Sequence, residues 1–528
     1  MFGPALAIRL RPSWADSMSS PIQSLSDEQP LRNRSTEVCV IGSGCGGATA
    51  ARVLAAAGKE VLLLEEGGDF RGERINQRDA EMYDQLYMDR GGRTTSDLSI
   101  SVMQGRALGG GTVVNNCDVV PIPRGVFALW RQRFGLNDLT EARMALFERQ
   151  AMEDLRASPI PEAEVNLANR LLRQGAEELG WRGEVMAHNR VGCVGLGTCM
   201  LGCPADAKRN MRLEVVPKAT AHGAQVLTRA RVTRIDGAQS EIKSLSVRAL
   251  DSKGHREVGE LSVRARYVIV AAGAIGSPLL LLRSGIGNDH VGRHLTLQPQ
   301  LPVTALFDEP PRAFEGIPQS YALTEFYDED DAEHGHWGFR VEPVMGTPGI
   351  VASLLPFTGH AGKRMMTLYS YSAGALVLVP DAPGAGRVHA TRSHRPRIEY
   401  ELAASTARRL REGARAAAHA YLAAGAREVV VPTQPPVRVT DVQDLSQIDN
   451  IPLSPARAPL ISAHQQGSAR MAPSGGLGAV DPEGRVFGTK GLYIIDSSVF
   501  PTSASSHTMV PIITMSHFLS QRLLAQIG

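Results

Sequence analysis

A glycine-rich turn between an apolar strand and a helix of small residues is the feature that most constrains how this chain can fold. Val38–Ile41 and Glu60–Leu64 are short apolar runs that predict buried strands, and Ala48–Ala57 between them is helix-like. The turn carries the glycines of a G-x-G-x-x-G motif, Gly42, Gly44 and Gly47. Glycines at this spacing let the backbone approach a pyrophosphate at the helix N-terminus. The segment therefore predicts a βαβ unit that binds a dinucleotide.

The second strand of this unit ends on an acidic residue. Glu65 follows the motif by about 20 residues, where the ribose hydroxyls of a bound dinucleotide need an acceptor. Ser43, inside the glycine turn, is expected in the same site. A glycine-rich turn and a surface glutamate can occur together without a ligand, but the strand–turn–helix context favours the nucleotide.

Further apolar strands are spread over the chain, so the predicted nucleotide domain is discontinuous. Tyr267–Val270 and Leu492–Ile495 predict buried strands, Thr406–Ala424 predicts a helix, and a last helix follows Pro511. Three alternating segments predict an antiparallel element: Val226–Ile235, Glu241–Leu250 and Glu260–Ala265. We assign residues 35–118, 205–300 and 455–528 to the nucleotide domain, 119–204 and 301–454 to a substrate domain, and 1–34 to an irregular N-terminal arm.

The composition excludes several classes of partner. The 528 residues carry a net charge of +2, which gives no reason to expect a nucleic acid or an anionic membrane surface as partner. No apolar run is long enough for a transmembrane segment, and residues 1–34 lack the apolar stretch of a secretory signal. We therefore expect a cytoplasmic protein, or a periplasmic one only if it is exported with a partner subunit.

Two more glycine-rich segments carry a resemblance to a known family. Gly105–Asn116 reads GRALGGGTVVNN, and Gly273–Gly287 reads GAIGSPLLLLRSGIG. Both are similar to signatures of the glucose–methanol–choline (GMC) oxidoreductases. The resemblance implies an α/β fold of the GMC flavoprotein type, in which a discontinuous Rossmann-like FAD-binding domain holds an inserted α+β substrate domain.

The same resemblance implies where FAD binds. The residues that we assign to the cofactor are Gly42, Ser43, Gly44, Gly47, Glu65, Arg106, Gly110, Gly111, Asn115, Val232 and Asp496. Some members of the family attach FAD through a histidine near position 115. Because this chain has Asn115 there, we expect FAD to be bound non-covalently.

Two histidines in the last quarter of the chain match catalytic segments of the family. His464 lies in AHQQGSARM, which is similar to the family pattern H-x-x-G-[ST]-x-R-M, and His507 lies in SSHTM. Alcohol oxidation needs a base on the hydroxyl, and a neutral imidazole suits that task. A second donor can stabilise the developing alkoxide. We expect His464 to be the base and His507 its partner, although the sequence leaves open which ring takes the proton.

A cysteine-rich segment allows two interpretations. Cys193, Cys199 and Cys203 are closely spaced, and Pro204 follows the last of them. Closely spaced thiolates hold iron–sulfur clusters, whereas zinc sites prefer C-x-x-C pairs and four ligands. The segment resembles bacterial FAD-dependent glucose and fructose dehydrogenase catalytic subunits, which implies a [3Fe–4S] cluster. It also resembles long-chain alcohol oxidase-like members, so reduced structural thiols are the alternative.

Together these features predict an enzyme that oxidises an alcohol or a sugar hydroxyl to a carbonyl by hydride transfer to flavin N5. If the cluster is present, electrons leave through it to an electron-acceptor subunit or a cytochrome. The alternatives are an oxygen-dependent oxidase of hydrophobic, long-chain alcohols and a non-redox hydroxynitrile lyase.

Overall fold

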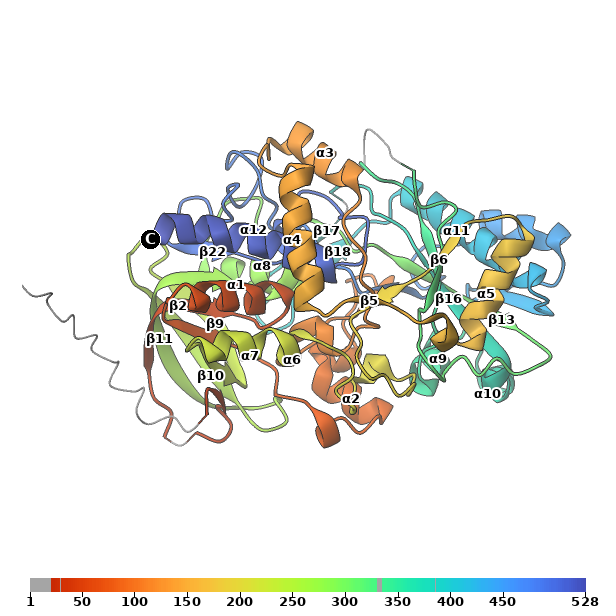
Figure 1. The fold of residues 1–528 in the computed structure, drawn as a ribbon, viewed down its shortest axis with the longest axis horizontal. Coiled ribbons are helices and arrows are strands. Elements are labelled where there is room, and N and C mark those ends of the chain that lie inside the picture. The colour runs from red at the N-terminus through yellow and green to blue at the C-terminus, as the bar shows by residue number, and fades with distance from the viewer. Residues whose placement is uncertain (1–19, 29, 330–334, 385) are drawn as a thin grey trace, which may run out of the picture.

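The computed structural model describes residues 20–28, 30–329, 335–384 and 386–528. Figure 1 shows an elongated molecule with two parts, each built on its own β-sheet and each with its own hydrophobic core. Residues 1–19 of the predicted irregular arm lie outside the described residues. The described part of the arm contains a short strand, β1 (Ile22–Ser24), which pairs in parallel with β8 (Gln225–Thr228) of the first sheet.

The first sheet contains the predicted βαβ unit. β2 (Arg34–Ile41), α1 (Cys45–Ala56) and β3 (Val61–Leu64) form this unit, and its two strands are parallel. The strand order is β1-β8-β3-β2-β11-β10-β9, with β22 paired to β11. The other strands are β9 (Ala230–Asp236), β10 (Lys243–Leu250), β11 (Glu257–Val270) and β22 (Leu492–Ile494). This is the Rossmann-like sheet that the glycine motif predicts.

One long strand joins the two halves of the first sheet. β11 pairs antiparallel with β10 along its first part and parallel with β2 and β22 at its end. The predicted antiparallel element is present as β9, β10 and the first part of β11. The segment predicted as Val226–Ile235 is divided between the parallel strand β8 and β9, and the expected separate strand at Tyr267–Val270 is the continuation of β11. The ends of β2, β11 and β22 meet at the N-terminus of α1. Three stretches that are far apart in the sequence thus come together at the glycine motif.

The second sheet forms the other part of the molecule. Its order is β20-β19-β13-β16-β15-β14-β6, with β21 paired to β13 and β4 paired to β21. The bounds are β4 (Ile100–Val102), β6 (Gly183–Val185), β13 (Gln300–Leu306), β14 (Tyr321–Leu323), β15 (Arg340–Pro343), β16 (Ser372–Leu378), β19 (Glu428–Val431), β20 (Val437–Val439) and β21 (Leu460–Ser462). The predicted helix of residues 406–424 is α11 (Ala404–Ala423), which packs with α5 (Leu167–Glu178) into the core of this sheet.

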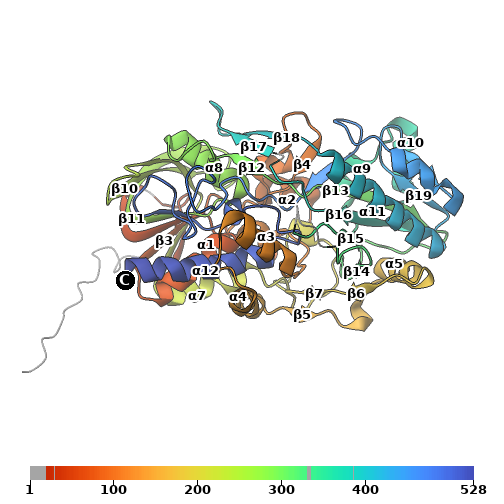
Figure 2. The same ribbon diagram turned by 90° about the horizontal axis from the view of Figure 1, so that it is seen from above.

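Two helices that the sequence places in the substrate domain pack on the first core. α3 (Arg124–Phe134) and α4 (Glu141–Asp154) bury Trp130 and Phe147 in the same core as the first sheet. Trp130 lies against Phe500, with ring centroids 5.4 Å apart. Figures 1 and 2 show α4 beside the C-terminal helix α12 (Met509–Ile527). Residues 124–154 therefore cover the nucleotide side of the molecule.

The remaining elements connect or flank the two parts. The other helices are α2 (Asp79–Leu86), α6 (Met211–Glu214), α7 (Val216–Ala221), α8 (Gly273–Ser284), α9 (Pro348–Leu354) and α10 (Gly359–Thr367). Two small sheets are formed by β12 (Arg293–Leu295), β17 (Gly386–His389) and β18 (Arg397–Tyr400), and by β5 (Ser158–Pro159) and β7 (Ala187–His188). Within the described ranges, no helix has both the length and the apolar character needed to cross a membrane.

Candidate active site

A cavity of about 670 Å³ is lined by residues of both parts of the molecule. The predicted cofactor residues that line it are Gly42, Ser43, Gly44, Glu65, Arg106, Gly110, Gly111, Asn115, Val232 and Asp496. His464 and His507 line the same cavity. Gly47 does not, because it lies inside the βαβ unit, where a Cβ would come within 1.8 Å of the Gly42 carbonyl oxygen. Its role is close packing of helix on strand, as the motif predicts.

Two glycine-rich turns touch each other through their backbones at one end of the cavity. Gly42 has φ +100°, and a Cβ there would lie 2.3 Å from the Ala271 carbonyl oxygen. Gly110 has φ +59°, and its Cβ would lie 2.6 Å from the Cα of Gly44. Only glycine allows both the positive φ values and this approach. The result is a backbone cradle beside the N-terminus of α1, the geometry that binds a pyrophosphate.

Glu65 is buried at the end of β3 and supports the glycine turn. One carboxylate oxygen accepts hydrogen bonds from Ser43 N at 3.0 Å and Ser43 Oγ at 2.6 Å, and the other accepts from Gly67 N at 2.7 Å. Burial raises the pKa of Glu65, and these three donors oppose that rise. Glu65 thus fixes the turn and lines the cavity at the position expected for ribose recognition.

Asp496 occupies a comparable place on the other side of the cavity. It accepts hydrogen bonds from Gly273 N at 2.9 Å and from the Ser277 hydroxyl, both in the first turns of α8. Burial raises the pKa of Asp496, and the donors around it oppose that rise. The residue links the end of β22 to the N-terminus of α8, where the family places a contact to FAD.

Several buried polar atoms around the cavity lack a partner among the described residues. Arg106 is 8% exposed, and its Nη1 donates to the Gly254 carbonyl at 3.0 Å, but its Nε and Nη2 have no acceptor. The Oδ1 atom of Asn115 is an acceptor, and it has no donor. Unsatisfied buried donors are costly, so they indicate a ligand with matching acceptors. A nucleotide with a pyrophosphate fits both these donors and the glycine cradle.

The two histidines that the sequence predicts to be catalytic lie side by side in the same cavity. Their ring centroids are 4.9 Å apart and their planes are inclined by 79°. Nδ1 of His464 lies 3.3 Å from Nε2 of Gln300, and Nε2 of His507 lies 2.9 Å from Glu342. The predicted pair is therefore brought together, although its members are far apart in the sequence.

The surroundings drive the two rings to opposite charge states. Burial, together with a smaller effect of the neighbouring His507, lowers the pKa of His464 to about 3. Burial also disfavours the charge on His507, but Glu342 outweighs it and, with help from Asp118, raises the pKa of His507. His464 is therefore a neutral imidazole near neutral pH, whereas the charged form of His507 is favoured relative to an ordinary histidine.

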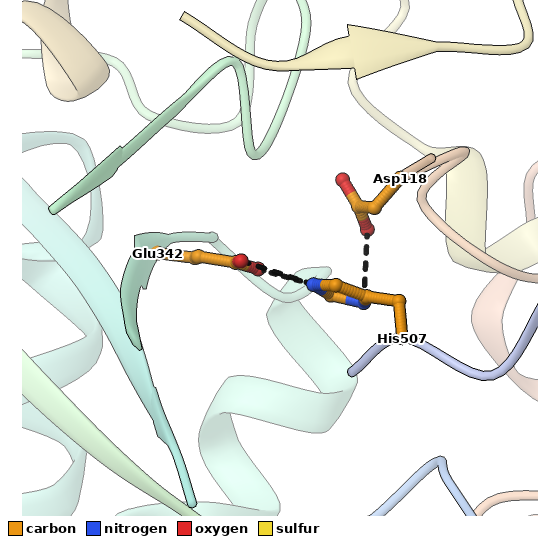
Figure 3. Close-up of side chains that lie close together, drawn as sticks. All are labelled: Asp118, Glu342 and His507. Atoms are coloured by element: carbon orange, nitrogen blue, oxygen red, sulfur yellow. Dashed lines mark hydrogen bonds and ion pairs between the residues drawn. The ribbon is translucent and has the colours of Figure 1, made fainter. Parts of the chain in front are cut away.

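The sequence did not predict the carboxylates on His507. Figure 3 shows Glu342 and Asp118 on its two sides, with Nδ1 of His507 3.8 Å from Asp118. Glu342 also accepts from Arg340 Nε at 2.8 Å and from Gln319 Nε2 at 2.8 Å. Glu342 lies on β15, which carries no motif. Asp118 directly follows the glycine-rich segment, and that proximity is the one signal that pointed toward it.

The cysteine segment lies next to the cavity, and an arginine fills the space between two of its sulfurs. Arg190 Nη1 lies 3.2 Å from Cys199 Sγ and 3.8 Å from Cys193 Sγ, and Met200 lines the cavity. In the part of the chain that the structure describes, one group of three residues has potential metal-ligand atoms within 4.8 Å of one another. Its members are Asp118, Glu342 and His507. Ion pairs between the histidine and the two carboxylates account for that group. Cys193, Cys199 and Cys203 form no such group.

Comparisons with known proteins identify the class. GMC oxidoreductase domains match residues 83–300 and 383–516, and a Rossmann-like NAD(P)-binding domain matches residues 40–101. An uncharacterised GMC-type oxidoreductase of Mycobacterium tuberculosis is 32% identical over 95% of this chain and 78% of its own length. This chain belongs to the GMC oxidoreductase family, whose members are FAD-dependent enzymes that act on CH–OH groups.

Two further relatives extend the comparison. A long-chain-alcohol oxidase of Arabidopsis thaliana is 28% identical over 92% of this chain and 67% of its own length. The crystal structure of a pyridoxine 4-oxidase superimposes with a TM-score of 0.66 over 93% of this chain and 99% of that one, at 18% identity. The second likeness shows the fold, with its Rossmann-like FAD-binding domain and its substrate domain.

The cradle generates a prediction about cofactor binding. Gly44 has φ −66°, so a valine at this position can adopt the same backbone conformation. The atom nearest to a Cβ built at position 44 would be Gly110 Cα, at 3.9 Å. The two methyl groups of Gly44→Val would then fill the cradle. We expect the variant to fold but to be purified without FAD, as measured by flavin absorbance and thermal melting of the apoprotein. Ala56→Val, exposed at the other end of α1, is the control and should keep its flavin. A Gly44→Val protein with a full complement of FAD would contradict the cradle.

Proposed function

We propose that this enzyme oxidises an alcohol that carries an apolar chain to the corresponding carbonyl compound. When bound, FAD supplies the hydride acceptor. The residues of the chain bind the alcohol, orient its carbinol carbon and remove the hydroxyl proton. The observation that carries the proposal is the apolar lining of the cavity beside the two histidines.

The part of the cavity that faces the histidines is formed by the second sheet and α9. Its apolar lining residues are Pro302, Val303, Val344, Met345, Ile350, Val351, Leu354, Leu355, Leu376 and Leu378. Among the described lining residues between positions 300 and 378, none carries a charge, and Gln300, Thr304 and Gln319 are the polar ones. A sugar would leave most of its hydroxyls without partners there, whereas an alkyl chain gains from burial.

α9 forms the outer wall of this apolar region. Its residues Ile350, Val351 and Leu354 line the cavity and are only partly buried. Asp79, the first residue of α2, accepts hydrogen bonds from the Thr347 hydroxyl and from Gly349 N, the latter at 3.2 Å. These two bonds hold the start of α9 against the nucleotide part. We propose that α9 contacts the alkyl chain of the substrate. The name of the plant relatives, long-chain-alcohol oxidase, agrees with this class of substrate.

The histidine pair assigns the proton chemistry. His464, held neutral by burial, accepts the hydroxyl proton, and the charged His507 stabilises the developing alkoxide. His464 needs a free Nε2 lone pair for this step, so its own proton must reside on Nδ1. In the structure the Gln300 amide nitrogen faces Nδ1, and an amide nitrogen can only donate. The tautomer with its proton on Nδ1 therefore requires a half-turn of the Gln300 amide, which brings the amide oxygen to the ring.

Substitution of either histidine tests this assignment. His464→Ala and His507→Ala should each retain FAD and slow flavin reduction by about 10²- to 10⁴-fold, the range for removal of a general acid–base group. In the wild type the rate should fall below about pH 3, where His464 gains a proton. It should also fall at alkaline pH, above the raised pKa of His507. Anaerobic stopped-flow absorbance measures all of these rates. Near-normal rates in both variants would remove the pair from the mechanism.

The apolar lining predicts which alcohols react. Under anaerobic conditions, octanol should bleach the flavin at much lower concentrations than ethanol, and glucose should be poor. Leu354→Trp should narrow the cavity and penalise octanol more than ethanol. Ser353→Ala, on the exposed side of α9, should leave the preference unchanged. A preference for glucose over octanol in the wild type would contradict the proposal.

A second candidate concerns the fate of the electrons after the flavin is reduced. We propose that FAD is bound non-covalently and that dioxygen accepts the two electrons and two protons directly, which gives hydrogen peroxide. The alternative is an iron–sulfur cluster on Cys193, Cys199 and Cys203, which the sequence spacing favours, but such a cluster would have to displace the Arg190 guanidinium from between two of the sulfurs. If electrons left the flavin through such a cluster, a cytochrome or an electron-acceptor subunit would be the partner that receives them.

Cofactor analysis of the wild type separates these routes. Protein purified without oxygen should release its FAD into the supernatant on acid precipitation, because Asn115 offers no covalent link, and it should contain no stoichiometric iron. About three irons per FAD would establish the cluster and overturn direct reoxidation. Flavin that remains in the protein pellet would contradict non-covalent binding.

A further inference from the structure

Another buried histidine, His188, lies behind the pair His464 and His507. His188, at the end of β7, is 1% exposed, and its Nε2 lies 2.9 Å from Asp118 Oδ1. The backbones of Asp118 and His188 are also paired by an antiparallel bridge, which holds the two side chains side by side. Asp118 lines the cavity beside His507, and Glu342 does not. Nothing in the proposed mechanism so far uses His188.

An arginine fixes the proton on His188. Arg190 Nε lies 2.8 Å from Nδ1 of His188, and a guanidinium can only donate. Nδ1 of His188 must therefore accept, so the ring proton resides on Nε2 and is donated to Asp118 Oδ1. Arg190 is itself anchored, because its Nη2 donates to the Asn116 carbonyl at 2.6 Å. One oxygen of Asp118 is thus occupied by a neutral donor, and the other oxygen faces His507.

His507 lies between two carboxylates that come from opposite sides. Glu342 binds Nε2, and Asp118 Oδ2 lies 3.8 Å from Nδ1. The latter distance is too long for a full hydrogen bond, so the Nδ1–H remains available to a substrate oxygen in the cavity. The other charged or titratable groups near the ring are Arg340, which pairs with Glu342, and the neutral His464.

We propose that Asp118, oriented by His188 and Arg190, is a positioning residue that acts with Glu342 to keep His507 doubly protonated, with its Nδ1–H directed toward the substrate oxygen. His507 then cannot accept the hydroxyl proton, and His464 alone does so. The inference rests on the proposed alcohol oxidation and deepens it, because it assigns a second carboxylate to the same site.

The chain supplies a matched control for a test of Asp118. Asp154 on α4 is also buried and pairs with a buried histidine, since its Oδ2 lies 2.9 Å from Nε2 of His517 on α12. Neither of these two residues lines the cavity. Asp154→Asn therefore removes a buried carboxylate from an Asp–His pair without touching the reaction.

The experiment compares the pH dependence of flavin reduction by octanol in FAD-loaded wild type, Asp118→Asn and Asp154→Asn. In Asp118→Asn the alkaline loss of rate should begin about 1 to 2 pH units lower than in the wild type, the usual effect of removing one opposite charge. His188→Phe should shift it in the same direction by a smaller amount, because Asp118 loses its donor but keeps its charge. Asp154→Asn should keep the wild-type profile. An Asp118→Asn profile that coincides with that of Asp154→Asn would overturn the proposal.

A direct measurement on the wild type covers the case in which Asp118→Asn fails to retain FAD. The ¹⁵N signals of His507, identified by their loss in His507→Asn, should show both ring nitrogens protonated at about one pH unit above the ordinary histidine value of about 6.5. A neutral His507 ring at that pH would overturn the proposal. Wild-type protein that no alcohol reduces would instead contradict the proposed function, and the ¹⁵N signals would still decide the charge of His507.

Discussion

The contact of backbone with backbone at the start of α1 is the constraint on which the rest of the structure depends. A Cβ on Gly46 would lie 1.9 Å from the Ile495 carbonyl oxygen, and one on Gly42 would lie 2.3 Å from that of Ala271. Because Gly42 and Gly46 have no side chains, the ends of β2, β11 and β22 can pack closely around the N-terminus of α1. Residues from the beginning, middle and end of the chain are thereby joined, and both the cofactor cradle and the histidines that follow β21 and β22 take their positions from this junction.

The site built on this junction uses burial to separate the roles of two chemically identical side chains. Burial, reinforced by the neighbouring His507, keeps His464 uncharged and outweighs the opposing effect of Glu342. His507 is equally buried but contacts Glu342, whose own charge is stabilised by His507 and Arg340 against the effect of burial, so that the pKa of Glu342 is lowered. Pairs of titratable groups whose environments push their pKa values apart are typical of acid–base catalysis. Here the difference in pKa comes from Glu342 on β15, which belongs to the second sheet, so the surroundings of the two histidines are complete only when both parts are in place.

Local patterns predicted the nucleotide site, and non-local contacts explain what was missed. The glycine motif and Glu65 are read from short segments, and the structure places the motif between β2 and α1 and Glu65 at the end of β3, as the pattern predicts. Glu342 and His188 could not be recognised, because their importance comes only from contacts with residues far away in the sequence. The positions of α3 and α4 also come from distant contacts, because Trp130 of α3 packs on Phe500 and α4 packs on α12. The cysteine spacing suggested a cluster, but Arg190, which no spacing pattern includes, is what contacts two of the sulfurs.

The central claim is that this cavity removes a hydride from the carbinol carbon of an apolar alcohol while a neutral histidine takes the hydroxyl proton. The most direct measurement is the anaerobic rate of flavin bleaching by octanol compared with octanol deuterated at the carbinol carbon. The account predicts that deuterium slows bleaching several-fold and that octanal appears in an amount equal to the flavin reduced. Equal rates with both alcohols under single-turnover conditions, or flavin that stays oxidised while the alcohol is consumed, would contradict it.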